Sequence, residues 1–160
     1  MQLAQQLVQR LLRQVKVEII QRQADLRQSG FVRRALQAAS QAVESLIIQA
    51  ADGSYRNRLL WARPDGTQAF YDKRHLFRMA GEHKHYSAGE QQVLLEVKGW
   101  QVRPLICYDL RFPVWSRDPQ GTDLLLYTAN WPAARRNHWN RLLPARAIEN
   151  LCYVAAVNRI

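Results

Sequence analysis

The sequence of 160 residues has the length of one domain, and its content of 48% hydrophobic and 22% charged residues is typical of a folded globular protein rather than a disordered one. No apolar run approaches the roughly 20 residues of a membrane-spanning helix, and we expect neither a membrane anchor nor a secretory signal peptide. The formal net charge of +10 permits weak attraction to nucleic acid or anionic lipid, but the scattered arginines indicate a solvated basic surface, so neither partner is expected.

Cysteine usage indicates a reducing compartment. Cys107 and Cys152 are the two cysteines, too few for a disulfide framework. Neither belongs to a Cys-x-x-Cys pair or to a His and Cys spacing typical of metal sites. We therefore expect a cytoplasmic protein that binds no metal.

Residues 1–44 differ in composition from the rest of the chain, with no Trp, Tyr, Cys, His or Pro and much Gln, Arg, Leu and Ala. Apolar residues at helical spacing predict an amphipathic helix over 2–14, and a second helix is expected over 31–45. Between them, the alternation over 15–19 is typical of a short strand. A basic amphipathic helix can bind membranes or acidic partners, but packing its leucine face on a core is the commoner role.

Strands dominate the next part of the chain. Three of them, bounded by turn residues, are predicted over 46–48, 55–62 and 67–71. We expect these strands to form an antiparallel meander. Farther on, strands over 93–97 and 100–107 are expected to form a hairpin around Lys98 and Gly99.

The last part of the chain alternates strands with one long helix. An almost continuous apolar strand over 123–128 is expected to be covered on both faces; a helix over 134–150 and an apolar strand over 152–157 follow it. Pro144 removes a hydrogen bond inside this helix and predicts a kink or a restart. Cys152 is expected to fill the core. The alternation indicates an α/β fold.

Cys107 ends the most informative strand, after which the chain turns polar at Asp109 and Arg111. The carboxyl end of a buried strand is where α/β sheets place reactive groups. A lone cysteine is most often a small buried hydrophobe, but Asp109 and Arg111 are poor core material, which favours a chemical role.

Lys73, at a strand end, and Glu82, in the following loop, are the groups that could serve this thiol. A thiol attacks carbonyl carbon as the thiolate, which a nearby cation favours, and a lysine can also donate to the oxyanion of a tetrahedral intermediate. A carboxylate beside them can move protons. Taken singly, both residues are more typical of a solvated surface. The spacing of the four histidines singles out none of them as a base.

Five segments, in this order, carry a resemblance to a known family. They are Tyr71–Phe77, Gly81–His83 with Tyr86–Gly89, Cys107–Pro113, Asn130–Pro132 and Ala145–Asn150. Together they make residues 45–160 resemble the nitrilase superfamily of carbon–nitrogen hydrolases, and especially its bacterial ω-amidase-like amidohydrolases. The resemblance implies an α/β fold that is part of an αββα sandwich, a homodimer, a small-molecule amide as substrate, and neither metal nor organic cofactor.

The resemblance also implies roles for individual residues. Cys107 matches the nucleophile, which forms a thioester as ammonia leaves. Lys73 matches the lysine that stabilises the oxyanion, and the backbone N–H of Tyr108 matches the second oxyanion donor. Glu82 matches an additional glutamate that orients the lysine and the substrate.

The implied substrates are ω-amides of dicarboxylic acids, such as 2-oxoglutaramate, which are hydrolysed to the oxo-acid and ammonia. Arg111 and Trp131 lie within or beside the matched motifs and are expected to line the pocket. An arginine there suits a substrate carboxylate.

The match departs from the family at both ends. The family's first catalytic glutamate, its general base, lies in an early Pro-Glu pair, and neither Glu18 nor Glu44 has such surroundings. Family members also continue beyond the position of Asn158. We therefore expect residues 45–160 to be the central part of the domain, preceded by a helical segment, 1–44, without a family match. Loss of the base predicts impaired catalysis.

Three functions are left open by these observations. The first is an amidase acting through Cys107 and Lys73. The second is an inactive remnant of such an enzyme, with exposed sheet edges and poor folding. The third, less favoured, is a basic helical module that binds nucleic acid or membrane in a salt-dependent manner.

Overall fold

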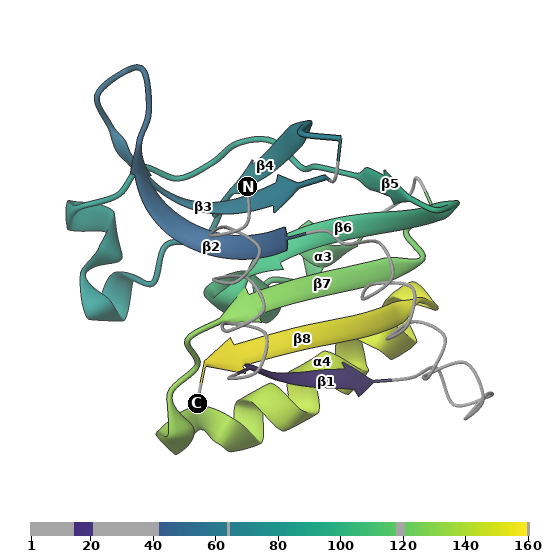
Figure 1. Ribbon diagram of the computed structural model, residues 1–160. Coiled ribbons are helices and arrows are strands. Elements are labelled where there is room, and N and C mark those ends of the chain that lie inside the picture. Colours follow the sequence, from purple (N-terminus) through teal and green to yellow (C-terminus); the bar gives the residue numbers. More distant parts are fainter. Residues whose placement is uncertain (1–14, 21–41, 64, 118–120, 160) are drawn as a thin grey trace.

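The computed structural model describes residues 15–20, 42–63, 65–117 and 121–159. This part of the chain forms a five-stranded sheet, in the order β1-β8-β7-β6-β5, and a three-stranded sheet, in the order β2-β3-β4 (Figure 1). The strands are β1 (Val15–Ile20), β2 (Ala42–Gln49), β3 (Tyr55–Ala62), β4 (Gln68–Asp72), β5 (Leu95–Val97), β6 (Trp100–Ile106), β7 (Leu124–Ala129) and β8 (Tyr153–Arg159). The α-helices are α3 (Pro113–Ser116) and α4 (Arg136–Asn150), and the 3₁₀ helices are η1 (Arg78–Ala80), η2 (Glu82–Lys84), η3 (Cys107–Arg111) and η4 (Ala133–Arg135).

The centre of the larger sheet is parallel, as an α/β fold requires. β6 pairs with β7 and β7 with β8 in parallel, whereas β5 and β1 add antiparallel edges. β7 is buried from Leu124 to Thr128, which accounts for its continuous apolar sequence. α4 connects β7 to β8 and packs along β8 and β1 (Figure 1). The predicted α/β fold is confirmed.

The three-stranded sheet is the predicted antiparallel meander, and one of its faces packs on the larger sheet. Leu59, Trp61 and Tyr71, from β3 and β4, are at most 1% exposed. They share one hydrophobic core with Leu105 of β6 and Leu126 of β7. Burial of this face joins the two sheets into one sandwich, since each sheet alone would expose an apolar surface to water.

The hairpin around Lys98 and Gly99 is confirmed, and its turn shows why the sequence predicts it. Both residues have positive φ, 50° and 83°, as a type I′ turn between antiparallel strands requires. Glycine adopts this conformation without strain, and the flanking residues alternate between the core and solvent.

The second helix is predicted to extend to residue 45, which is too far, because β2 begins at Ala42. The helix predicted over 2–14, and the part of the second helix before residue 42, lie outside the described residues. Residues 42–45, predicted as helix, belong to strand β2, where Val43 pairs with Trp61 and packs against the core. Cross-strand pairing overrides the local helix propensity there. The strand predicted over 15–19 is confirmed as β1.

α4 continues through Pro144 from Arg136 to Asn150, so the predicted restart is wrong. Leu143 and Ala147, on either side of the proline, are at most 1% exposed, and their burial against the core offsets the lost hydrogen bond. Cys152, just beyond the helix, is 3% exposed and fills the core as predicted.

The carboxyl ends of β6, β7 and β8 lie at one edge of the larger sheet, and the short helices that follow β4 lie at the same end of the molecule (Figure 1). Parallel strands bring their carboxyl ends together, and this edge is where α/β sheets place functional groups. Within the described ranges, no helix combines the length and apolar character needed to cross a membrane.

Gly89 packs directly against the end of β4. Its N–H donates to the carbonyl of Lys73 at 2.9 Å, and its own carbonyl accepts from Arg74 at 3.1 Å. A Cβ added at Gly89 would overlap the backbone carbonyl of Asp72. We predict that Gly89→Ala lowers the free energy of unfolding by about 3 kcal/mol, because the strand end has to shift. Urea denaturation would measure this loss.

Gly99→Ala is the matched control for that substitution. A Cβ on Gly99 meets nothing within 4 Å, so the control costs only the left-handed backbone conformation, about 1 kcal/mol. Equal losses in the two variants would contradict the close packing at Gly89.

Candidate active site

Cys107 lies at a tight corner between β6 and η3. Its φ of +46° is in the left-handed region, which costs free energy for any residue with a side chain. The corner ends the strand, and the next backbone N–H, that of Tyr108, falls in the first turn of η3, where N–H groups have no acceptor within the helix. The predicted position of the thiol at the carboxyl end of a buried strand is confirmed.

Lys73 follows β4 immediately, and its side chain is 1% exposed. Its Nζ donates to both carboxylate oxygens of Glu82, to Oε1 at 2.9 Å and to Oε2 at 2.7 Å. Glu82 Oε2 also accepts from the backbone N–H of Phe77 at 2.7 Å. The expectation that Lys73, taken singly, is solvated is therefore wrong, because a paired carboxylate makes burial of the ammonium tolerable.

The Cys107 thiol lies within the electrostatic reach of this ion pair. Burial raises the pKa of the thiol above its ordinary value and is the largest effect. The Lys73 ammonium and a hydrogen bond from the backbone N–H of Asn130 lower that pKa, whereas the carboxylates of Glu82 and Asp109 raise it. The structure thus brings the Lys73–Glu82 ion pair within electrostatic reach of the Cys107 thiol.

Asp109 is a part of this site whose role the sequence did not reveal. It is 0% exposed, and its carboxylate accepts four hydrogen bonds. The donors are the hydroxyl of Tyr71 at 2.8 Å, the N–H of Ile106 at 3.0 Å, and both the N–H and the ring Nδ1 of His75 at 2.9 Å. The view of Asp109 as poor core material is corrected by these donors, which replace the water that a carboxylate loses on burial.

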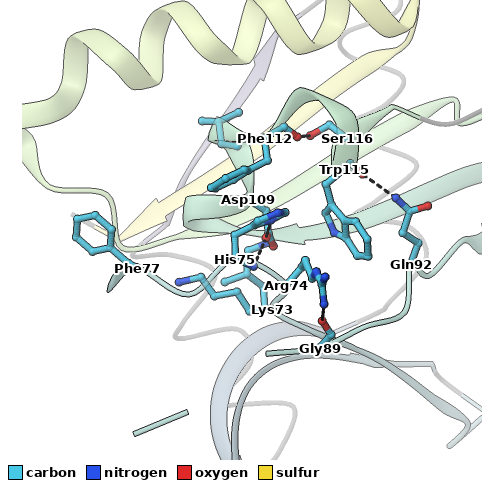
Figure 2. Close-up of polar contacts among 12 residues, drawn as sticks. Lys73, Arg74, His75, Phe77, Gly89, Gln92, Asp109, Phe112, Trp115 and Ser116 are labelled. Atoms are coloured by element: carbon cyan, nitrogen blue, oxygen red, sulfur yellow. Dashed lines mark hydrogen bonds and ion pairs between the residues drawn. The ribbon is translucent and has the colours of Figure 1, made fainter. Parts of the chain in front are cut away.

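The donors of the Asp109 carboxylate are themselves fixed by aromatic neighbours. The ring of His75 stacks on Phe112, with centroids 3.6 Å apart and planes 6° apart (Figure 2). The hydroxyl of Tyr71 accepts from the indole N–H of Trp115 at 2.9 Å, which leaves its own proton for the carboxylate. Because a carboxylate only accepts, Nδ1 of His75 carries the proton in this contact.

Arg111 and Trp131 lie together beside the thiol segment. The guanidinium carbon of Arg111 is 5.1 Å from the centroid of the Trp131 ring, and its Nη2 is 2.8 Å from Nδ1 of His138. A second arginine, Arg135, covers the ring of Phe77 at 5.4 Å. Cations held on aromatic faces in this way keep their charge available, which suits an anionic ligand.

α4 contacts η3 through a buried arginine. Arg146 is 4% exposed, and its Nε donates to the carbonyl of Leu110 at 3.0 Å while its Nη1 contacts Glu149 at 2.9 Å. The matched segment Ala145–Asn150 therefore supports the corner that carries the thiol.

An open cavity of about 600 Å³ lies away from these residues, between β3, β4 and the loop after η2. None of the six predicted site residues lines it. Its two arginines are already engaged, Arg58 with Asp72 at 2.6 and 2.8 Å and Arg56 with Asp52 at 3.0 Å. Within the described part of the chain, no group of three His, Cys, Asp or Glu side chains is arranged to hold a metal ion.

Comparison with known protein families supports the resemblance seen in the sequence. The family described as carbon–nitrogen hydrolase matches residues 17–160, a range that begins ahead of residue 45 and includes most of β1. The ω-amidase YafV of Yersinia enterocolitica is 60% identical over 116 residues, which are 72% of this chain and 45% of that protein. A 2-oxoglutaramate amidase of Bacillus subtilis is 48% identical over 90 residues, which are 55% of this chain and 35% of that protein.

Solved structures show the same similarity. A CN-hydrolase superfamily protein from Xanthomonas campestris, crystallised with an arsenic adduct in its active site, has a TM-score of 0.73 and 48% identity to this chain. The similarity covers 80% of this chain and 51% of that one. The matched part of the present chain thus spans about half the length of its relatives.

The electrostatics of the thiol can be tested by alkylation. We predict that Lys73→Met moves the pH midpoint of Cys107 alkylation by iodoacetamide upward by about one unit, because a cation that favours the thiolate is lost. Glu82→Gln is expected to move it downward. The rates would be measured in a Cys152→Ala background, so that Cys107 is the one thiol present. Burial raises the pKa of Cys152 to about 11, so this second thiol is expected to contribute little to alkylation even in the parent.

Lys84→Met removes an exposed ammonium from η2, the helix that carries Glu82, and is the matched control. A shift in this control as large as that of Lys73→Met would show that the effect comes from net charge rather than from the site.

Proposed function

The chain belongs to the carbon–nitrogen hydrolase family, and from this premise we propose that it hydrolyses the C–N bond of small ω-amides of dicarboxylic acids. One observation carries the proposal: a buried ammonium, that of Lys73, is paired with Glu82 within electrostatic reach of the Cys107 thiol. An ammonium so placed can both favour a thiolate and donate to a developing oxyanion. The 2-oxoglutaramate amidase among the relatives supports the choice of substrate class.

The proposed reaction has two steps. The sulfur of Cys107 attacks the amide carbon, and Lys73 Nζ and the N–H of Tyr108 donate to the oxyanion. The C–N bond then breaks, the nitrogen receives the proton that the thiol has lost and leaves as ammonia, and a thioester remains. Water hydrolyses the thioester to the carboxylic acid and restores the thiol.

Glu82 is proposed to orient Lys73 rather than to act as the base. Its carboxylate already accepts two hydrogen bonds from the ammonium and one from the N–H of Phe77. Another group therefore has to remove the thiol proton. In the family this group is the first catalytic glutamate, which this chain is expected to lack. We propose that this chain turns over slowly and that acylation of Cys107 is its readily detected step.

Arg111 is proposed to bind the carboxylate end of the substrate. Its observed neighbours, His138 and Trp131, are not anionic and hold the guanidinium without neutralising it. A planar guanidinium can bind a carboxylate through two parallel hydrogen bonds, which gives direction as well as affinity.

The test of the activity is a covalent adduct. We predict that 2-oxoglutaramate acylates Cys107, and that intact-mass spectrometry after acid quenching detects the adduct while a coupled assay detects slow ammonia release. Cys107→Ala should abolish both signals, and Cys152→Ala should leave both. A folded protein that shows neither adduct nor ammonia would contradict the proposal and favour the inactive remnant.

The test of specificity compares two arginines. We predict that Arg111→Gln raises KM for 2-oxoglutaramate at least tenfold with little change in kcat, because a charged contact common to ground and transition states is lost. The control is Arg141→Gln, which removes an exposed arginine of α4 that contacts Asn137. The KM for a neutral aliphatic amide should change in neither variant. An equal rise in KM for both amides on Arg111→Gln would exclude carboxylate binding by Arg111.

A further inference from the structure

The two segments that carry the proposed catalytic groups come from different sheets. Lys73 follows β4 of the three-stranded sheet, and Cys107 follows β6 of the five-stranded sheet. No strand ladder joins β4 to β6, so backbone pairing within a sheet does not set the spacing of the ammonium and the thiol. A contact between the sheets has to set it.

The Asp109 carboxylate makes such a contact on both sides. Tyr71 precedes Lys73 by two residues and His75 follows it by two, and both donate to the carboxylate. On the other side, the chain closes a loop around Cys107, since the N–H of Ile106 donates to the side chain of Asp109.

We propose that Asp109, with His75 and Tyr71 as its donors, is a positioning residue that fixes the distance between the Lys73 ammonium and the Cys107 thiol. The consequence for catalysis rests on the proposed amidase activity. The spacing of Lys73 and Cys107 does not depend on that activity and is tested separately.

The chemistry of the contact requires a carboxylate. All four partner groups of Asp109 are donors, and a carboxylate has four acceptor sites on two oxygens. An amide in its place would turn its NH₂ toward two of those donors. Because Asp109→Asn therefore threatens folding itself, the outer members of the contact are the better probes.

Aromatic packing makes the contact rigid enough to set a distance. Stacking on Phe112 fixes the plane of the His75 ring, and the indole of Trp115 lies edge-on to that ring at 5.9 Å (Figure 2). The same indole donates to Tyr71. Each donor therefore has one orientation, and loss of one leaves one of the four acceptor sites of the buried carboxylate unfilled.

The experiment measures how strongly Lys73 acts on Cys107 in different backgrounds. In each background, which also carries Cys152→Ala, the pH midpoint of Cys107 alkylation by iodoacetamide is measured with and without Lys73→Met. The readout is the upward shift of this midpoint that Lys73→Met produces. We expect Tyr71→Phe and His75→Leu to reduce this shift to less than half. His75→Asn, which keeps an N–H donor close to the position of Nδ1, should restore most of it.

Tyr127→Phe is the matched control for Tyr71→Phe. Tyr127 is also a buried tyrosine; its hydroxyl contacts Ser116 Oγ at 2.8 Å, whereas the hydroxyl of Tyr71 contacts Asp109, Trp115 and the backbone N–H of Arg74. Tyr127→Phe should lower thermal stability, because a buried hydroxyl contact is lost, and should leave the Lys73→Met shift unchanged. Tyr71→Phe removes a single oxygen, so the test stands even if His75→Leu fails to fold.

The proposal is overturned if Lys73→Met produces the same shift in folded Tyr71→Phe protein as in the parent, or if Tyr127→Phe reduces the shift equally. The rate of Cys107 acylation by 2-oxoglutaramate should fall at least tenfold in Tyr71→Phe without a matching rise in KM. If the parent protein itself forms no acyl adduct, the proposed function fails, and the alkylation shifts still decide the geometry.

Discussion

A carboxylate buried at the meeting point of two sheets is the constraint on which this site depends. Asp109 has no contact with solvent, and burying its charge costs several kcal/mol before any compensation. Hydrogen bonds to a charged group contribute about 1.5–3 kcal/mol each, so the four that Asp109 accepts can together offset that cost. The proposal that Asp109 fixes the spacing of Lys73 and Cys107 rests on this contact, since its donors flank Lys73 on one side and Cys107 on the other.

The electrostatic balance at the thiol follows from this arrangement. Burial and two carboxylates, those of Glu82 and Asp109, favour the neutral thiol, whereas Lys73 favours the thiolate. A developing oxyanion would change the balance, because the Lys73 ammonium, already fixed by Glu82, can donate to it without reorganising.

Local sequence patterns predict the parts of this structure that depend on local geometry. The meander, the turn at Lys98, the corner at Cys107 and the α/β order all follow from apolar periodicity and turn residues. The burial of Lys73 and Asp109 does not, because it depends on partners far along the chain, 9 residues away for the first and as many as 38 for the second. Only the family resemblance brought Lys73, Glu82 and Cys107 together in advance. The helical prediction for residues 42–45 is wrong for the same reason, since pairing with β3 decides their conformation.

The central claim is that Lys73 Nζ and Cys107 Sγ face one reacting carbonyl. A crystal structure of the full chain, trapped as the Cys107 thioester with 2-oxoglutaramate, measures this most directly. We predict that the thioester oxygen accepts from Lys73 Nζ at about 2.7–3.1 Å. A thioester oxygen that points away from Lys73, with the Lys73 to Glu82 contact unchanged, would contradict it.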